Sequence, residues 1–268
     1  MVILISPLLN PHEFSSYDPT ILVLNRDYEN HFNLRGLDYH QAMELYPEIR
    51  DLEFRQLFEG IHLKAFKTVI DLPSGGSYLK PYLPASCEIL AFDPATGFHG
   101  TKESISPISF EDLELPSSCA DAVVTLAAMH HIEDPMPFLR KVGHSLKVGG
   151  VHLIGDVRAH SPVAHFLDEF CGHHNGLGHK GYFLPDAQEA FGPIPSELHL
   201  ERYEVRPFLW TAKDLNSMLE FTKGLFGLNQ IHDHDLQQGL EKYLNLQWNN
   251  QSCSIEWELV YLRICKTN

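Results

Sequence analysis

The sequence has few basic residues for its size. Lysine and arginine together number 20, whereas aspartate and glutamate number 35, which gives a formal net charge of −15. Proteins hold nucleic acids and anionic membrane surfaces largely through Lys and Arg, so we expect neither as a partner. A small molecule or a modest protein surface is the better expectation.

Long apolar runs and paired cysteines are lacking too. No run approaches the ~18 apolar residues of a membrane-spanning helix. The apolar start "MVILISPLLNP" has no basic region and no small-residue cleavage site, so we interpret it as an N-terminal arm rather than a signal peptide. Without a C-x-x-C pair, a disulfide framework or zinc ribbon is disfavoured and a reducing cytoplasm is expected. The cysteines are odd in number and scattered: Cys87, Cys119, Cys171, Cys253 and Cys265.

Hydrophobic residues make up 44% of the 268 residues, enough for one large α/β domain. Residues 1–66 are predicted to form an N-terminal arm and a helical cap. Up to residue 36 there is little periodicity, whereas 38–66 shows a helical pattern with a break at Pro47.

The middle of the chain alternates between apolar strands and helical segments. Buried strands spaced in this way predict a doubly wound parallel sheet. A helix is expected over 135–150, closed by Gly149-Gly150. The predicted strands are 66–72, 87–93, 105–109, 120–129 and 151–157.

The last third is less regular. Residues 158–197 are rich in His, Gly and Pro and are interpreted as an insertion. A sixth strand is predicted over 199–210, and a helix over 211–228 with Thr211 as its cap. A second helix over 232–249 and an alternating seventh strand over 254–266 follow.

Four collinear motifs run from about Thr68 to Asp156. They are "VIDLPSGGS", "ILAFDP", "ISFEDLELPSSCADAVV" and "TLAAMHHIEDPMPFLRKVGHSLKVGGVHLIGDV". Together they resemble the class I S-adenosylmethionine-dependent methyltransferases, in the small-molecule, ubiquinone-biosynthesis-like branch known as methyltransferase type 11. The resemblance implies a Rossmann-like, seven-stranded, mostly parallel sheet in the order 3-2-1-4-5-7-6, with the last strand antiparallel. It also implies one methyltransferase domain over 1–268: the cap, a cofactor-binding half (67–157), a substrate lid (158–197) and C-terminal elements (198–268).

The first motif departs from the glycine loop of that family. Asp71 matches the acidic residue that opens D-x-G-x-G-x-G and Gly75 matches the central glycine, but Pro73 and Ser77 replace the outer two. A tight strand-to-helix turn needs a glycine where the backbone approaches the cofactor. Gly75 and its neighbour Ser74 are expected at the methionine part of the cofactor, whereas Pro73 shapes the turn without donating a hydrogen bond.

The later motifs imply further cofactor contacts. Asp93, followed by Pro94, lies 93 − 71 = 22 residues after Asp71, where a carboxylate accepts both ribose hydroxyls. Ser109 and Phe110 match the positions that hold the adenine amino group, although Ser109 replaces an acid. Either the Ser109 hydroxyl accepts that hydrogen bond, or Glu111 or Asp112 takes over the role with a small register shift. Leu126 is expected at the methionine end, and Asp121 falls on the Asp of F-D-x-V. S-adenosylmethionine is thus the expected cofactor and S-adenosylhomocysteine its product.

His130 and His131 follow the fourth predicted strand, at the sheet edge where ligands bind in such folds. Either is a candidate general base, since an imidazole titrates near neutral pH. The alternative is that one packs at a helix start and the other lines the pocket passively.

A second histidine cluster lies in "CGHHNGLGHKGYF". Three interpretations of this segment stay open: a loop over the substrate, a structural loop, and a metal site formed by His173, His174 and His179. Because the spacing H-H-x4-H matches no strong ligand signature, no metal is predicted. Tyr39 and Arg35 are candidate contacts for the cofactor's amino-acid end. Equally, Tyr39 can be a packed core residue and Arg35 an ordinary surface arginine. For an acceptor cavity the candidates are Tyr182, Phe208 and Trp210, although core packing is the default interpretation of these aromatic residues.

The leading hypothesis is methyl transfer from S-adenosylmethionine to a small organic acceptor. Two others stay open: a scaffold that keeps the fold without the chemistry, and a cofactor-binding enzyme that does not methylate. The acceptor, its reacting atom and the oligomeric state do not follow from the sequence.

Overall fold

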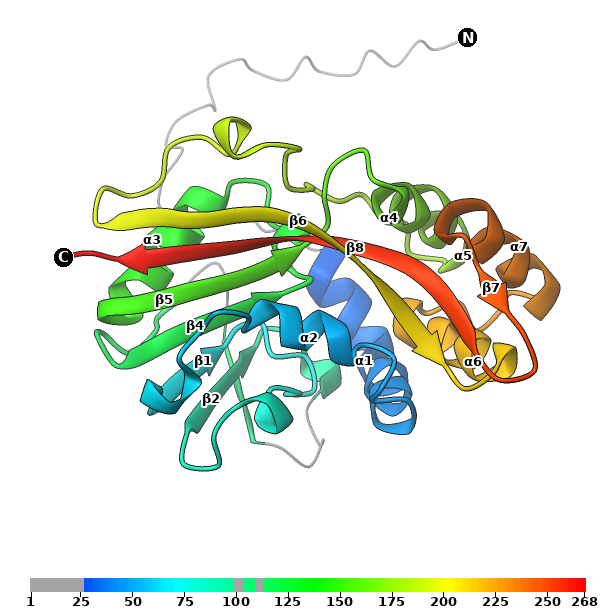
Figure 1. Cartoon of the computed structure of the whole chain (residues 1–268), viewed down its shortest axis with the longest axis horizontal. Helices are drawn as coiled ribbons and strands as arrows, with labels where there is room; N and C mark the ends of the chain where they lie inside the picture. The colour runs from blue at the N-terminus through cyan, green and yellow to red at the C-terminus, as the bar shows by residue number, and fades with distance from the viewer. Residues whose placement is uncertain (1–26, 99–103, 109–112) are drawn as a thin grey trace, which may run out of the picture.

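A computed structural model describes residues 27–98, 104–108 and 113–268. Its eight-stranded sheet has the order β3-β2-β1-β4-β5-β8-β6, with β7 paired to β8 (Figure 1). The strands from β3 to β5 are parallel, and β8 runs antiparallel to β5, β6 and β7. The bounds are β1 Thr68–Asp71, β2 Glu88–Asp93, β3 Ile105–Pro107, β4 Ala120–Leu126, β5 Leu146–Asp156, β6 Leu198–Ala212, β7 Gln247–Trp248 and β8 Cys253–Lys266.

This sheet confirms the predicted fold class and strand order. The short β7 shifts the numbering by one, so the predicted seventh strand is β8. The reason the strands read as continuous apolar runs is that both faces are covered. Val69 and Leu153 belong to one core cluster with α2 (Asp51–Leu57), whereas Ile70 and Ile154 belong to another with α3 (Pro135–Ser145).

The remaining helices gather at two places. In Figure 1, α1 (Asp27–Leu45) crosses behind the carboxyl ends of the parallel strands. Helices α4 (Pro162–His165), α5 (Gly172–His174), α6 (Leu215–Phe226) and α7 (Asp233–Leu244) surround the protruding ends of β6 and β8. The short turns are η1 Leu63–Ala65, η2 Lys80–Tyr82, η3 Thr96–Phe98, η4 Met129–His131 and η6 Gln188–Ala190, and η5 (Phe166–Cys171) is a π-helix joining α4 to α5.

Helix α1 begins at Asp27, 11 residues before the predicted start at residue 38. The prediction missed the first part of the helix because its apolar face is sparse. Tyr28, Phe32, Tyr39 and Met43 recur at helical spacing, but polar residues and Gly36 separate them. Of these four, Tyr28, Phe32 and Met43 are buried. The helix is therefore held by contacts with the rest of the protein more than by its own pattern.

Helix α3 ends at Ser145, before the predicted end at Gly149-Gly150. Those glycines lie within β5, where the pairing register with β4 shifts between Ala120 and Ala122. Gly149 has a φ of +78°, and a Cβ on Gly150 would lie 2.8 Å from the Lys147 carbonyl oxygen. The two glycines therefore form a bulge in a strand rather than a helix cap.

Helix α6 starts later than predicted. Its cap is Asp214, whose Oδ1 accepts from the Ser217 amide at 2.8 Å, whereas Thr211 is still paired in β6. Gly227, at a φ of +69°, ends the helix in the left-handed conformation. Helix α7 likewise ends at Leu244, so the predicted helix over 232–249 was too long.

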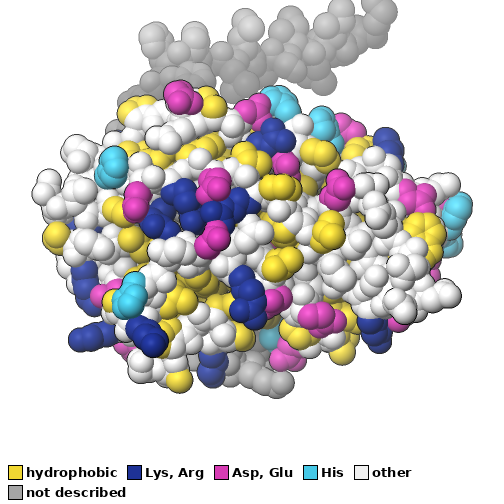
Figure 2. Space-filling model, in the orientation of Figure 1, with side chains coloured by type: hydrophobic (Ala, Val, Ile, Leu, Met, Phe, Trp, Pro, Cys, Tyr) yellow, Lys and Arg dark blue, Asp and Glu magenta, His cyan; other side chains and the backbone are white. Residues whose placement is uncertain are grey.

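Figure 2 shows basic and acidic side chains interleaved over β6 and β8. They form surface ion pairs: Arg206–Glu204 at 2.7 Å, Arg263–Glu201 at 3.5 Å and Arg158–Glu258 at 2.7 Å. The arginines of these pairs are therefore neutralised by their neighbours. No helix in the described part of the chain combines the length and apolar character needed to cross a membrane.

Candidate active site

The loop after β1 is a tight turn that depends on glycine. Gly75 has a φ of +55°, in the left-handed region, and its amide donates to Asp93 Oδ2 at 2.7 Å. A Cβ on Gly76 would lie 2.1 Å from the Tyr78 hydroxyl oxygen. The turn thus joins the ends of β1 and β2 through a backbone-to-carboxylate hydrogen bond.

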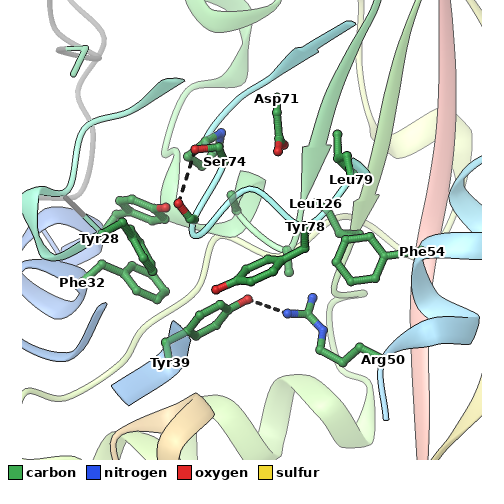
Figure 3. A pocket seen from close by; sticks show the side chains of 15 residues that line it. Tyr28, Phe32, Tyr39, Arg50, Phe54, Asp71, Ser74, Tyr78, Leu79 and Leu126 are labelled. Atoms are coloured by element: carbon green, nitrogen blue, oxygen red, sulfur yellow. Dashed lines mark hydrogen bonds between the residues drawn. The ribbon is translucent and has the colours of Figure 1, made fainter. Parts of the chain in front are cut away.

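A cavity lies over this loop; we name it the cofactor cavity, and the one beside it the acceptor cavity, after the ligands that the family resemblance implies. Figure 3 shows rings of α1 and the loop, among them Tyr28, Phe32, Tyr39 and Tyr78, around it. Its empty volume is about 460 Å³. A Cβ on Gly75 would enter this space at 3.7–3.9 Å from three aromatic rings. Glycine at 75 therefore keeps open a cradle that any larger residue would fill.

Asp71 supplies an unsatisfied acid to the cofactor cavity. Its carboxyl is buried, and Oδ2 has no hydrogen-bond partner among the described residues. Burial, with the nearby Asp93, raises the pKa of Asp71 well above its ordinary value. A cationic ligand group beside this carboxyl would satisfy it and favour its ionised form.

Asp93 is held by three hydrogen bonds. Its carboxylate accepts from the amides of Gly75 and Ala95, at 2.7 and 2.8 Å, and from the Tyr28 hydroxyl at 3.0 Å. Burial raises the pKa of Asp93 to about 7, although these hydrogen bonds oppose the rise. Since Tyr28 covers the carboxylate, Asp93 is fully buried and lies behind the lining of the cavity.

Helix α1 packs on η3 by direct backbone contact. A Cβ on Gly97 would lie 1.9 Å from the Phe32 carbonyl oxygen, and one on Gly36 would lie 2.7 Å from the Gly97 carbonyl carbon. The Asn33 side chain also accepts from the Thr96 amide and hydroxyl, at 2.6 and 2.9 Å. These contacts fix the helix that carries Tyr28 over the end of β2.

A second cavity, the acceptor cavity, adjoins the first. Both are lined by Phe32, Tyr39, Arg50 and Ala127, so these residues mark the junction. The acceptor cavity has an empty volume of about 630 Å³. Its far wall includes Trp210 and Trp257, stacked with ring centroids 3.9 Å apart at an interplanar angle of 15°.

Three histidines line the acceptor cavity: His130, His131 and His179. Asp156 accepts from His130 Nδ1 at 2.6 Å, and Asp168 accepts from His179 Nδ1 at 2.7 Å. Burial, with the neighbouring histidines, lowers the pKa of His131 well below its ordinary value. Burial also lowers the pKa of His179. His131 and His179 are therefore neutral at pH 7 and retain a nitrogen lone pair.

The comparison with known families concerns the part of the chain that lines most of the cofactor cavity and contributes His130 and His131 to the acceptor cavity. A family model described as a methyltransferase domain matches residues 71–154, from the loop after β1 into β5. This part of the chain is a methyltransferase domain. A search of curated protein sequences gave no match to the chain.

Solved methyltransferases share the architecture around this domain. The N-methyltransferase NodS of Bradyrhizobium japonicum, in complex with S-adenosylhomocysteine, is 11% identical with a TM-score of 0.52, covering 90% of this chain and 100% of that one. A Thermotoga maritima S-adenosylmethionine-dependent methyltransferase is 12% identical with a TM-score of 0.51, covering 90% and 99%. A Haloferax volcanii protein solved with the Trm112 methyltransferase activator is 15% identical with a TM-score of 0.53, covering 88% and 97%. At these identities the likeness concerns the fold.

The methyltransferase domain distributes the predicted residues over both cavities. The cofactor cavity is lined by Asp71, Pro73, Ser74, Gly75 and Leu126, and the acceptor cavity by His130 and His131. Asp93 and Pro94 lie behind the cofactor cavity lining. Ser109 and Phe110, with Glu111 and Asp112, lie outside the described residues. Asp121 is placed away from both cavities, where it accepts from the Lys67 and Thr68 amides at 2.8 and 2.9 Å.

Several candidates that the sequence analysis treated together lie in different places in the fold. Arg35 lines the acceptor cavity, whereas Tyr39 lines both cavities. Trp210 lines the acceptor cavity, but Tyr182 and Phe208 do not. Of the three histidines predicted as a possible metal site in the His-rich segment, His179 lines the cavity, whereas His173 and His174 lie on α5 and do not.

Sequence reasoning missed Tyr28, Arg50 and Trp257. Arg50 lines both cavities, forms a buried ion pair with Glu53 and donates to the Tyr39 hydroxyl. The aromatic spacing of α1 could have pointed to Tyr28. Nothing local marks Arg50 or Trp257, because their importance depends on contacts between distant segments.

Proposed function

We propose that this chain transfers a methyl group from S-adenosylmethionine to a small acceptor that carries an aromatic or other flat apolar part. The observation that carries the proposal is the junction of the two cavities at Phe32, Tyr39, Arg50 and Ala127. A methyl donor on one side and a nucleophile on the other would meet there in line. The methyltransferase domain supplies the walls of the donor side.

The donor side fits the cofactor. The orphaned Asp71 carboxyl suits the methionine ammonium, and Gly75 leaves the cradle open. Asp93 can accept the ribose hydroxyls once the Tyr28 hydroxyl withdraws from it. When bound, the cofactor supplies a sulfonium methyl group that a nucleophile can displace.

The acceptor side suits a flat ring with one polar edge. Trp210 and Trp257 offer an aromatic wall, and Phe226 stacks near Trp257 with ring centroids 6.0 Å apart. Arg35 lines the same cavity, and its buried Nε has no hydrogen-bond partner among the described residues. An oxygen on the acceptor would satisfy that donor.

His130 and His131 remain our candidate bases. Since His130 Nδ1 is bonded to Asp156, the tautomer that donates there leaves Nε2 as an acceptor. A hydroxyl or ammonium acceptor at the junction would lose its proton to such a nitrogen as the methyl group arrives. The carboxylate of Asp156 would then stabilise the imidazolium.

The test measures binding and turnover separately. Calorimetry with S-adenosylmethionine and S-adenosylhomocysteine is expected to show one site per chain, and mass spectrometry of copurified small molecules is expected to identify acceptor candidates. These candidates, assayed with methyl-labelled cofactor, should give a labelled product with the native protein. Failure to bind either cofactor form would refute the proposal. Binding without turnover on any copurified compound would favour the scaffold or the non-methylating enzyme.

We also infer one continuous methyltransferase unit, with residues 158–197 acting as its substrate lid, in a reducing compartment such as the cytoplasm. Leu167, Cys171 and His179 support the lid, since they reach from this segment into the acceptor cavity. The compartment is supported by the five cysteines, none of which forms a disulfide. Limited proteolysis with and without the acceptor would test the lid.

A further inference from the structure

We propose that His130, His131 and His179 bind a divalent transition-metal ion in the acceptor cavity. One ring nitrogen from each lies within 4.8 Å of the other two. Nitrogens bound to one tetrahedral zinc ion lie roughly 3.4 Å apart, as follows from zinc–nitrogen bonds of about 2.0–2.1 Å. Small rotations of the rings would therefore complete the site.

The outer partners of two of the histidines are those of metal ligands. Metal-binding histidines commonly give their second nitrogen to a carboxylate, which orients the ring and raises its basicity. Here Asp156 holds His130 Nδ1 at 2.6 Å and Asp168 holds His179 Nδ1 at 2.7 Å. In each ring this leaves Nε2 for the ion.

Both carboxylates are fixed in turn by the backbone. Asp156 also accepts from the Val157 amide at 2.6 Å, and Asp168 from the Gly181 amide at 3.0 Å. Gly172 lets the loop that carries His179 approach α5, because a Cβ there would lie 2.9 Å from the His179 amide nitrogen. The ligand set is thus held in place from outside the cavity.

A fourth histidine lies beside the cluster. His31 of α1 is 2% exposed, and its Nδ1 is buried without a hydrogen-bond partner among the described residues. Its ring lies 6.2 Å from the His179 ring, edge to face. A ligand or water on the ion would satisfy this orphaned nitrogen.

The charges around the cluster permit a dication. Asp156 and Asp168 place two carboxylates behind the ligands. Two guanidinium groups line the same cavity, but Arg50 is paired with Glu53, which leaves the charge of Arg35. Three imidazoles favour zinc, cobalt, nickel or copper over magnesium and calcium, which prefer oxygen. Three protein ligands also leave an open coordination position, as in catalytic rather than structural zinc sites.

The role of the ion rests on the proposed function. With Nε2 bound to the ion, His130 would serve as a ligand instead of as the base. An acceptor hydroxyl or thiol in the open position would lose its proton to solvent more readily, since the cation stabilises the anion. That anion would form the bond to the methyl carbon while the methyl–sulfur bond breaks and its electron pair stays on sulfur. The products are the methylated acceptor, S-adenosylhomocysteine and one proton. The acceptor class is therefore a flat compound with an oxygen or sulfur donor.

The test uses full-length untagged protein, stripped with a chelator and titrated with Co²⁺ and then Zn²⁺. We expect about one Co²⁺ per chain, with visible absorption bands that zinc abolishes. His179→Ala should weaken binding by at least tenfold, and Asp168→Asn by roughly 10–100-fold. The matched control His173→Ala lies on α5 outside the cavity and should bind as the native protein does. Circular dichroism verifies the fold of each variant.

Stoichiometric binding that His179→Ala leaves unchanged would overturn the proposal, as would the absence of binding in folded native protein. Calorimetry with S-adenosylhomocysteine on the same samples separates the two hypotheses. Absence of metal binding in the native protein, with the cofactor still bound, refutes the metal site alone. Loss of cofactor binding with the metal still bound refutes the proposed function.

Discussion

The Tyr28 hydroxyl donates to the buried Asp93 carboxylate at 3.0 Å, from a helix 65 residues away in sequence. Two backbone amides occupy the same carboxylate. The tyrosine hydroxyl thus takes the position that the family resemblance assigns to a ribose hydroxyl. A cofactor that reaches Asp93 has to displace it.

Tyr28→Phe is expected to raise the affinity for S-adenosylhomocysteine by several-fold. The variant removes a competing donor, and a hydrogen bond to a charged acceptor contributes about 1.5–3 kcal/mol. Calorimetry at pH 8 would measure the change. Tyr203→Phe is the control, because its hydroxyl donates to the Pro185 carbonyl oxygen outside both cavities. Weaker binding in Tyr28→Phe would mean that Tyr28 itself holds the cofactor.

Gly75→Val is expected to abolish detectable cofactor binding, because the side chain would fill the cradle between three rings. Its backbone strain needs a control, since any non-glycine residue at a φ of +55° costs about 1–2 kcal/mol. Gly149→Val provides it: that residue has a φ of +78° and open space around its Cβ position. We expect the two variants to lose similar amounts of thermal stability. Only Gly75→Val should lose cofactor binding, whereas Gly149→Val should bind as the native protein does. Intact binding in Gly75→Val would remove the loop from the cofactor site.

Cofactor affinity is expected to fall as the pH drops below 7. Burial holds the pKa of Asp93 at about 7, and ribose hydroxyls donate to the ionised form. Below that pH binding has to be accompanied by proton release, which lowers the affinity by up to about tenfold per pH unit. Calorimetry from pH 5.5 to 8.5 would record the slope. Asp93→Asn should bind weakly and lose this component of the slope; an unchanged slope would place the titrating group elsewhere.

His152 predicts an acid limit on stability. It is fully buried, and burial lowers its pKa to about 3, whereas the unfolded chain takes up its proton near pH 6.5. The free energy of unfolding is therefore unaffected by His152 above pH 6.5 and falls as the pH drops from 6.5 toward 3. At pH 4.5 the loss from this residue is about 3 kcal/mol. His152→Gln should keep a donor to Thr125 and show a smaller fall in unfolding free energy between pH 7 and 4.5.

The exposed His144 serves as the control for that prediction. Urea unfolding of His144→Gln is expected to follow the pH profile of the native protein. Equal profiles for all three proteins would contradict the prediction, since they would show that His152 takes up its proton in the folded state as readily as in the unfolded chain.

The central strands β1, β4 and β5 could be predicted because they are largely buried and each carries enough apolar residues to be recognised alone. The exposed two-residue β7 carries no such pattern and was not predicted. Helix α1 could not be delimited in this way, since Gly36 and Gly97 hold it by backbone contact rather than by an apolar stripe. The cap of α6 was assigned to Thr211, but β6 continues through that residue because its pairing with β8 is long. In both cases, contacts between distant segments set the ends of the helix, and the local sequence pattern did not.

Some residues of the candidate site could likewise be placed from the sequence, and others could not. Asp71 and Gly75 follow a strand directly, so their position could be predicted from the chain itself. His179 was grouped with His173 and His174 because they are close in sequence, whereas in the fold it faces His130 and His131. Only the packing of the loop on α5 brings it there.

The stacked pair Trp210–Trp257 gives the protein a built-in optical reporter. The chain has 3 tryptophans, and the third, Trp248, is 46% exposed, whereas Trp210 and Trp257 are 1% and 4% exposed. Emission from the buried pair originates at the wall of the acceptor cavity, and Trp248 can be replaced without touching it. A Trp248→Phe protein would therefore allow unlabelled compound collections to be screened by fluorescence, with each hit read from the cavity itself.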